Sequence, residues 1–186
     1  MRLFIAIELP DPLKKDVGEW TKALARAIPD PKRRLHWVKE DQFHLTLKFL
    51  GETKEDRIPA LCRALRVAVN RNSHFSLRLA KAGHFGGRVI WLGTDSGTDQ
   101  VIRLAEAVDE TCIPLGFGRE GRAYQAHITL ARSKMNVGTL RMADLPPLLI
   151  QKTFRPFQVS EVSLIQSTLT PQGAVYRTLE RFSLKA

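Results

Sequence analysis

Two hydrophobic patterns alternate along the chain. Short runs that are continuously apolar, or that alternate apolar with polar residues, predict strands, whereas longer segments with apolar residues every three or four positions predict helices. The predicted strands cover residues 2–9, 43–50, 74–85, 88–94, 126–131 and 154–167, with a closing hairpin of 163–169 and 174–184. The predicted helices cover residues 11–28, 56–70, 98–112 and 142–151. No segment rich in glycine and serine separates these elements as a flexible linker would.

The order of these elements is repeated. A strand, a helix, a strand with a histidine near its start, a helix and a further strand fill approximately residues 1–86, and the same order follows in residues 87–186. Duplicated units of this kind predict an α+β fold with two pseudo-symmetric lobes, each a mostly antiparallel sheet with helices on its outer face. The uncovered faces of the two sheets would meet as a cleft. We therefore expect a single bilobal domain over residues 1–186, with the active-site cleft between the lobes.

Length and composition narrow the class of protein. A chain of 186 residues with 44% hydrophobic residues can bury one core, or two small lobes that share one. Its apolar runs are far shorter than the roughly 20 residues of a membrane span, so we expect no membrane association and a cytoplasmic location. Cys62 and Cys112 have neither the spacing of a metal site nor the density of a disulfide scaffold, which predicts reduced, mostly buried thiols. The chain is expected to be a monomer.

The charge balance favours a polyanionic partner. The formal net charge is +10, and Lys and Arg raise affinity for phosphates by neutralising charge and releasing counterions. The basic residues are dispersed along the chain and do not form a tail of like charge. A proteome rich in arginine would give the same balance. Charge therefore favours nucleic acid as the partner without identifying it.

Two short segments share one pattern. HLTLKFLG at residues 44–51 opens on a histidine with a threonine two positions later, and HITLAR at residues 127–132 repeats that pattern. Alternate side chains of an extended strand share one face. The side chains that alternation places on one face are His44, Thr46 and Lys48 in the first segment and His127, Thr129 and Ala131 in the second. The side chains that it directs away from that face, toward the core, are Leu45, Leu47, Phe49, Ile128 and Leu130.

Two histidines that face each other form a site for acid–base chemistry. An imidazole has an unperturbed pKa near 6.5, so a pair supplies one neutral base and one protonated acid near neutral pH. The threonine hydroxyls can donate hydrogen bonds to an oxyanion held between the rings, and Lys48 or Arg132 can add positive charge. These groups suit a phosphodiester: one histidine activates water for in-line attack on phosphorus, and the other protonates the departing oxygen. Two contributions of about 10²–10⁴ each make a catalyst that needs no metal or cofactor.

Two other interpretations compete with acid–base catalysis. Metal binding is disfavoured because each motif supplies one possible ligand, and no Asp, Glu or Cys alternates with the histidine, although distant carboxylates could still converge. Both histidines could instead be satisfied core residues, beside threonines chosen for their β-propensity. The recurrence of the motif at equivalent places in a repeat argues against that structural role.

The paired motifs resemble those of the two-histidine (2H) phosphoesterase superfamily, and in particular its RNA 2′,3′-cyclic phosphodiesterases, also called 2′-5′ RNA ligases. The opening MRLFIAIELP, the middle FGGRVIWLG and the ending LIQSTLTPQGAVYRTLERF match landmarks of that family in their usual order. The resemblance covers nearly the whole chain. It implies a bilobal fold with a basic cleft, metal-free opening of an RNA 2′,3′-cyclic phosphate to a 2′-phosphate, and reversible 2′-5′ ligation. The implied partner is RNA with a 2′,3′-cyclic phosphate end or a 2′-5′ linkage.

The resemblance also implies roles for individual residues. His44 matches the proton donor to the leaving 3′-oxygen, and His127 matches the proton acceptor that activates water, although the residues by themselves do not distinguish the two roles. Thr46 and Thr129 match the phosphate-binding threonines. Arg132 matches an arginine near the phosphate or the adjoining nucleotide. Strand alternation alone would point Arg132 away from the site, so its inward placement requires the strand to bend or end there.

Several alternatives remain open. Ala126 stands before His127 where such proteins often have a proline, so the approach to that histidine is less constrained in φ. Phe4 could line the cleft or lie in the core, and His36 and His84 could stack on a base or have packing roles. A non-catalytic module that binds RNA ends would use the same basic cleft. A phosphodiesterase acting on small cyclic nucleotides would use the same chemistry.

Overall fold

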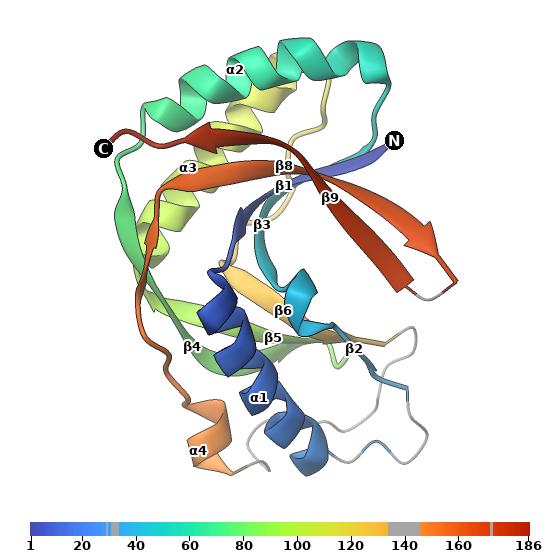
Figure 1. Ribbon diagram of the computed structural model, residues 1–186, viewed down its shortest axis with the longest axis vertical. Coiled ribbons are helices and arrows are strands. Elements are labelled where there is room, and N and C mark those ends of the chain that lie inside the picture. Colours follow the sequence, from blue (N-terminus) through green and yellow to red (C-terminus); the bar gives the residue numbers. More distant parts are fainter. Residues whose placement is uncertain (29, 31–33, 134–145, 172) are drawn as a thin grey trace.

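A computed structural model of the chain describes residues 1–28, 30, 34–133, 146–171 and 173–186 (Figure 1). Helices and strands alternate along the chain largely as the hydrophobic pattern predicts. The strands are β1 (Arg2–Glu8), β2 (His36–Trp37), β3 (His44–Glu52), β4 (Phe75–Phe85), β5 (Val89–Ser96), β6 (His127–Arg132), β7 (Phe157–Val159), β8 (Glu161–Thr170) and β9 (Gly173–Ser183). The α-helices are α1 (Asp11–Ala27), α2 (Ile58–Asn70), α3 (Thr98–Cys112) and α4 (Pro147–Ile150), and the 3₁₀ helices are η1 (Glu40–Gln42), η2 (Glu55–Arg57) and η3 (Ile113–Leu115).

The described strands form one continuous sheet that curls through the molecule (Figure 1). Its order is β7-β4-β5-β6-β3-β1-β8-β9, with β2 added beside β6, and each pairing between these strands is antiparallel. The two lobes therefore share a sheet, and they join where β3 lies beside β6 through the pair Leu45 and Ile128. These two residues occupy equivalent places in the two motifs. The joint thus lies on the pseudo-symmetry axis between the repeated halves.

The helices cover one face of this sheet with their apolar stripes. The buried helical residues that carry these stripes include Val17, Trp20, Leu24, Leu61, Leu65, Val69, Val101, Leu104 and Val108. α2 lies against α3 and β9, α3 lies against β3, and α1 lies beside η1 and α4 (Figure 1). These side chains and the inward residues of the strands form one core. The other face of the sheet carries a smaller apolar cluster of Phe4, Ala6, Ile165 and Tyr176, and it is this open face that holds the candidate site.

Two β-bulges at equivalent places change which side chains reach the open face. One bulge lies at Leu47 of β3 and the other at Leu130 of β6, where each strand has one residue more than its partner, β1 or β5. An extra residue shifts the alternation of every side chain that follows it. The bulges thus leave both histidines and both threonines on the face that alternation predicts. They exchange the faces of the two residues after each bulge, and in β3 a further register shift follows at Leu50.

The sequence-based prediction for Lys48 and Phe49 was therefore wrong. Lys48 is buried on the helix side of the sheet, where its ammonium forms an ion pair with the Asp109 carboxylate and donates to the Gly118 carbonyl oxygen at 2.7 Å. Phe49 lies on the open face with 55% of its surface exposed, instead of in the core. Lys48 consequently adds no charge to the candidate site. Arg132, which occupies the place equivalent to Phe49, turns toward the open face.

Smaller differences concern the end of the chain. The predicted strand at 154–167 is divided between β7 and β8, because β7 pairs with β4 whereas β8 pairs with β1 and β9. The predicted closing hairpin is present as β8 and β9. The predicted helix at 142–151 is represented by α4, and its residues 142–145 lie outside the described part of the chain. Of the helices described, none has the length and apolar character to cross a membrane.

Both cysteines are free thiols, as predicted. Cys112 is buried within the core, and Cys62 is half-buried on α2. Burial raises the pKa of the Cys112 thiol to about 11 and also raises the pKa of Cys62. A thiol with a raised pKa holds little of the reactive thiolate at neutral pH, which argues against either cysteine as a nucleophile.

Candidate active site

His44 and His127 begin the two strands that meet at the joint of the sheet. The Nδ1 atom of His44 lies 2.8 Å from the carbonyl oxygen of Gln42, and that of His127 lies 2.7 Å from the carbonyl oxygen of Gln125. A carbonyl oxygen only accepts a hydrogen bond, so Nδ1 carries the proton in both neutral rings and Nε2 is the atom left for proton transfer. The backbone two residues before each histidine therefore sets both the tautomer and the ring orientation.

The register of the sheet places the two histidines on neighbouring strands. Leu45 lies directly opposite Ile128, which makes His44 and His127 diagonal neighbours on one face, with Cα atoms roughly 7–8 Å apart. The two histidines also interact electrostatically, since a positive charge on His127 lowers the pKa of His44. The two motifs thus lie side by side on the adjoining strands β3 and β6.

Burial controls the protonation of both imidazoles. It lowers the pKa of His44 to about 4, although the hydrogen bond to Gln42 raises that pKa. Burial likewise lowers the pKa of His127, against the opposite effect of its bond to Gln125. The charge of Arg132 lowers the pKa of both rings. In the unliganded site both histidines are therefore neutral near pH 7, and an anion placed between them would favour protonation of one ring.

Arg132 faces the site because of the bulge at Leu130, which supplies the bend that its inward placement requires. Its Nη2 atom donates a hydrogen bond to the Oγ1 atom of Thr129 at 3.2 Å. The Thr129 hydroxyl thereby accepts from the guanidinium and keeps its own proton available for an anion. The positive charge of Arg132 lowers the pKa of both histidines. The same charge would attract an anion bound near either ring.

A cavity of about 580 Å³ opens on the His44 side of the site. It includes two of the other predicted site residues, Thr129 and Arg132. Phe4, for which the sequence left core and cleft open, lines this cavity and packs on the His44 ring at a centroid distance of 4.7 Å. The remaining lining residues are Arg2, Leu3, His36, Trp37, Val38, Gln42, Phe49, Ser167, Leu169, Ala174 and Tyr176. Basic groups and aromatic rings are thus interleaved around the space.

A second hollow of about 250 Å³ lies on the His127 side. Phe85 stands edge-on to the His127 ring there at a centroid distance of 5.0 Å. Thr46 lines neither hollow, although its backbone carbonyl accepts a hydrogen bond from the Tyr124 hydroxyl, which belongs to the second hollow, at 2.7 Å. His84 also lies outside both, and its Nδ1 accepts a hydrogen bond from the amide of Gly87. The histidines therefore stand between two spaces of unequal size.

Sequence reasoning missed three residues of the site. Gln42 and Gln125 orient the histidines through backbone carbonyls, which strand patterns do not reveal, although the repeat Q-x-H-x-T was visible in both halves. The Gln42 side chain also donates to the carbonyl oxygen of Ala174 at 2.5 Å, which ties the approach to His44 to β9. Tyr176 of β9 stands edge-on to the His44 ring at 5.3 Å. No local signal marks Tyr176, because the curl of the sheet brings it there.

Comparisons with known proteins agree with this architecture. The family model described as LigT-like phosphoesterase matches the chain twice in succession, over residues 7–91 and 92–176. The RNA 2′,3′-cyclic phosphodiesterase of Thermotoga maritima is 32% identical over 96% of this chain and 93% of its own length. That of Methanothermobacter thermautotrophicus is 30% identical over 99% of each chain. That of Escherichia coli is 30% identical over 98% of this chain and 96% of its own.

Solved structures share the whole fold, including its repeated halves. The protein TT0787 of Thermus thermophilus superposes with a TM-score of 0.80 at 30% identity, over 100% of this chain and 98% of that one. E. coli LigT complexed with 3′-AMP gives a TM-score of 0.78 at 28% identity, with the same coverage. The resemblance inferred from the two motifs is confirmed by these matches, and the chain belongs to the LigT-like phosphoesterase family.

Proposed function

We propose that this protein opens 2′,3′-cyclic phosphate ends of RNA to 2′-phosphate ends, with reversible 2′-5′ RNA ligation at the same site. The observation that carries the proposal is the pair His44 and His127, diagonal across the joint of the sheet, each with Nδ1 bonded to a backbone carbonyl. Two oriented imidazoles beside an arginine and a threonine match the proton transfers and the charge of this reaction. The curated relatives, named as RNA 2′,3′-cyclic phosphodiesterases, support the substrate.

The reaction assigns one proton transfer to each ring. His127 Nε2 takes a proton from water while the water oxygen bonds to phosphorus, and the bond from phosphorus to the 3′-oxygen breaks. His44, protonated at Nε2, gives that proton to the leaving 3′-oxygen. The product is a 2′-phosphate beside a 3′-hydroxyl, and proton exchange with solvent restores the two rings. Thr129, Thr46 and Arg132 would stabilise the negative charge that gathers on the non-bridging oxygens.

The unequal hollows support this division of roles. The 2′- and 3′-oxygens of the cyclic phosphate belong to one ribose, so the nucleoside must lie on the side of the leaving oxygen. The cavity of about 580 Å³ adjoins His44 and has the volume of a small-ligand site. The hollow of about 250 Å³ adjoins His127, on the side where water attacks. In ligation a 5′-hydroxyl takes the place of water, and its nucleoside would occupy part of this second hollow.

Product analysis tests the proposal directly. RNA with a 2′,3′-cyclic phosphate end is expected to yield a 2′-phosphate end, distinguished from a 3′-phosphate by its chromatographic position beside both standards. EDTA is expected to leave the rate unchanged, because the two imidazoles supply both proton transfers. Among the described residues, no group of three or more His, Cys, Asp or Glu side chains is placed to hold a metal ion. A 3′-phosphate product, or loss of activity in EDTA, would contradict the proposed reaction.

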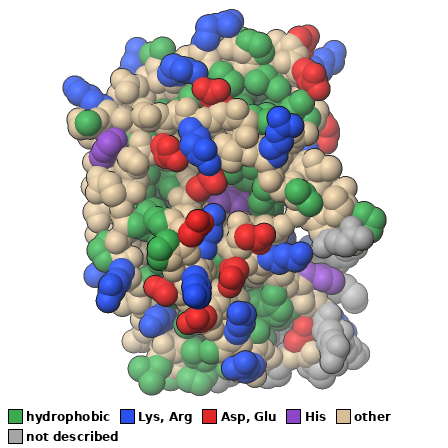
Figure 2. Space-filling view, in the orientation of Figure 1, with side chains coloured by type: hydrophobic (Ala, Val, Ile, Leu, Met, Phe, Trp, Pro, Cys, Tyr) green, Lys and Arg blue, Asp and Glu red, His purple; other side chains and the backbone are tan. Residues whose placement is uncertain are grey.

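The length of the substrate separates the enzymatic alternatives. The face shown in Figure 2 carries acidic side chains among its lysines and arginines, so no single basic patch there identifies a long RNA. We expect a higher kcat/KM for oligonucleotides that end in a cyclic phosphate than for nucleoside 2′,3′-cyclic phosphates. The opposite order would favour a phosphodiesterase of small cyclic nucleotides. Binding without any product would favour the non-catalytic RNA-end-binding module.

Removing the Thr129 hydroxyl should weaken stabilisation of the phosphoryl oxygens. Thr129→Val keeps the shape and β-propensity of the residue, and we expect a fall in kcat of about 10²-fold, the effect of losing one donor to a developing anion. Steady-state kinetics on cyclic-phosphate-ended RNA measure this fall. Thr168→Val makes the same exchange at an exposed position of β8 and should leave kcat unchanged. Equal rates for the two variants would remove Thr129 from the proposed site.

A cytoplasmic location and a monomeric state stay predictions. Gel filtration with light scattering measures the second, and the site as described needs no partner chain, since both histidines and both hollows come from one polypeptide.

A further inference from the structure

The two histidines differ in the residue that stands opposite each in the neighbouring strand. Glu8 of β1 is the cross-strand partner of His44, and Gly93 of β5 is the partner of His127 at the equivalent place. A side chain at position 93 would be crowded, because a Cβ there would lie 3.3 Å from the carbonyl oxygen of Ala80. At this point one carboxylate breaks the pseudo-symmetry of the site.

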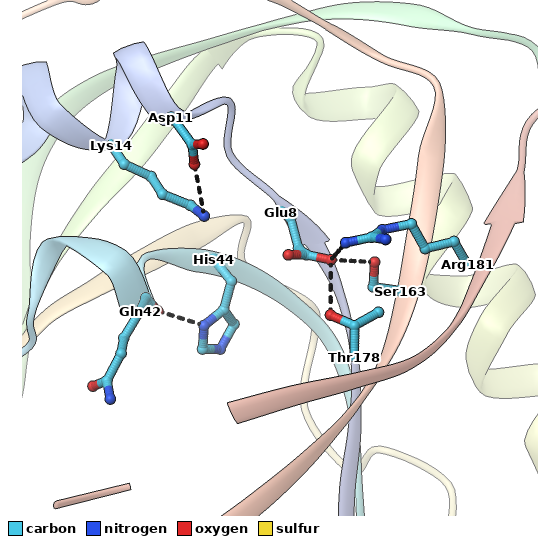
Figure 3. A network of polar contacts seen from close by, with 8 residues as sticks. All are labelled: Glu8, Asp11, Lys14, Gln42, His44, Ser163, Thr178 and Arg181. Atoms are coloured by element: carbon cyan, nitrogen blue, oxygen red, sulfur yellow. Dashed lines mark hydrogen bonds and ion pairs between the residues drawn. The ribbon is translucent and has the colours of Figure 1, made fainter. Parts of the chain in front are cut away.

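Contacts on one side hold the Glu8 carboxylate in place. Its Oε1 atom accepts hydrogen bonds from the hydroxyl of Ser163 at 2.5 Å and of Thr178 at 3.3 Å, and the Arg181 guanidinium lies 3.5 Å away. Figure 3 shows these three residues on one side of Glu8 and the His44 ring on the other, with the second carboxylate oxygen directed away from the three donors. The carboxylate is therefore oriented beside His44.

The negative charge of Glu8 is not cancelled by its partner. Arg181 also pairs with Glu161, with its Nε atom 3.3 Å from the Glu161 carboxylate, so one guanidinium serves two carboxylates and the group keeps a net negative charge. The nearby ammonium of Lys14 is itself paired with Asp11 at 3.4 Å (Figure 3). A carboxylate that stays charged beside an imidazole favours the imidazolium, and Glu8 accordingly raises the pKa of His44.

In the described structure burial lowers the pKa of His44 more than Glu8 raises it. A cyclic phosphate bound between the rings would bury both histidines and place its charge beside both, so burial would separate their pKa values less in the substrate complex. Arg132 lowers the pKa of both rings. Tyr176, which faces His44 from β9, stays neutral because burial raises the pKa of its hydroxyl. Arg2 also lines the cavity beside His44, but among the described residues Glu8 is the carboxylate that acts on His44 and has no counterpart acting on His127.

We propose that Glu8 is a positioning residue that directs the catalytic proton to His44, and so makes His44 the acid and His127 the base. The inference rests on the proposed function, because it concerns the two proton transfers of that reaction. It accounts physically for a division of roles that the two matching H-x-T motifs do not contain.

Glu8→Gln tests this role without changing the shape of the residue, since the amide oxygen can still accept from Ser163 and Thr178. The acid must be protonated, so activity is lost as pH rises through its pKa in the substrate complex. Without the carboxylate that loss begins at lower pH. We expect the alkaline limb of the pH profile of kcat to move down by on the order of half to one unit, with about a 3- to 10-fold fall in kcat at pH 8 and an unchanged acidic limb.

Glu180→Gln is the matched control, because Glu180 of β9 pairs with Arg66, shares no ion pair with Glu8 and has no cross-strand relation to His44. Its pH profile should superimpose on that of the wild-type enzyme. Equal shifts in both variants would show a general effect of charge and overturn the role of Glu8. Glu8→Asp keeps the negative charge, so its alkaline limb is expected at the wild-type position. If Glu8→Gln fails to fold, the pH profile of Glu8→Asp is compared with that of a neutral variant, Glu8→Ala or Glu8→Asn.

A sulfur substrate gives an independent readout. In a nucleoside 2′,3′-cyclic phosphate with sulfur replacing the bridging 3′-oxygen, the leaving thiolate departs without a proton. Glu8→Gln should then match the wild-type rate. A persistent defect on that substrate, a shift of the acidic limb or an unshifted profile would each overturn the inference. Absence of any cyclic phosphate turnover by the wild-type protein would instead overturn the proposed function.

Discussion

Replacing either His44 or His127 with alanine is expected to lower kcat for cyclic phosphate opening by about 10²–10⁴-fold, the usual contribution of one positioned acid or base. In the proposed reaction each ring provides one of the two proton transfers, so the loss of either ring removes the acid or the base. The fold should survive, because both rings lie on the open face, outside the main core. Single-turnover rates on cyclic-phosphate-ended RNA, with circular dichroism of each variant, measure the two quantities separately.

Two comparisons make the result specific. His74→Ala removes a histidine that precedes β4 and lines neither hollow, and this variant should keep the wild-type rate. The sulfur substrate should rescue His44→Ala, because its leaving group needs no acid, and should leave His127→Ala defective, because water still needs a base. Retained turnover by either alanine variant on the normal substrate would refute the two-histidine mechanism, and rescue of His127→Ala in place of His44→Ala would reverse the assigned roles.

The fold could be predicted from the sequence where local patterns and tertiary environment agree. Periodicity located the principal helices and strands, and the repeated order of elements indicated two related halves. It did not show that the halves share one sheet, because the pairing of β3 with β6 joins residues far apart in the chain. It also failed at Lys48 and Phe49, because a bulge depends on the register between neighbouring strands. Alternation predicted that Lys48 points out of the core, whereas its side chain is buried in an ion pair with Asp109.

The part of the candidate site that could be predicted from the sequence is the set of side chains that a motif marks. Two H-x-T motifs predicted the histidines and threonines, and the family resemblance added Arg132; the roles of these residues stay predictions. The residues that orient the histidines act through carbonyls, and Tyr176 and Glu8 reach the site through strand pairing, so no linear spacing reveals them. Glu8 belongs to the segment MRLFIAIELP that carries the family resemblance. Its proposed effect on the protonation of His44 depends on strand pairing, which places Glu8 opposite His44 and Gly93 opposite His127.

Removing the Lys48 ammonium is expected to destabilise the protein more than any other charge substitution discussed. The Lys48 side chain is 1% exposed and that of its partner Asp109 is 13% exposed, so Lys48→Met leaves a largely buried carboxylate without its counter-charge. The Gly118 carbonyl loses its donor in the same change. The expected loss in free energy of unfolding is about 3–5 kcal/mol. Urea denaturation followed by circular dichroism measures it.

The double variant Lys48→Met/Asp109→Leu separates two contributions to the free energy of unfolding: the net stabilisation by the ion pair, and the cost of leaving one charge without its partner. Replacing both charges by apolar side chains leaves no uncompensated charge, so most of the lost stability should return. Lys22→Met removes a lysine that is 67% exposed and 4.0 Å from Glu40, and it should change stability by less than about 0.5 kcal/mol. A Lys48→Met variant as stable as Lys22→Met would mean that water or backbone rearrangement satisfies Asp109. In that case the joint of β3 with α3 would depend on apolar packing alone.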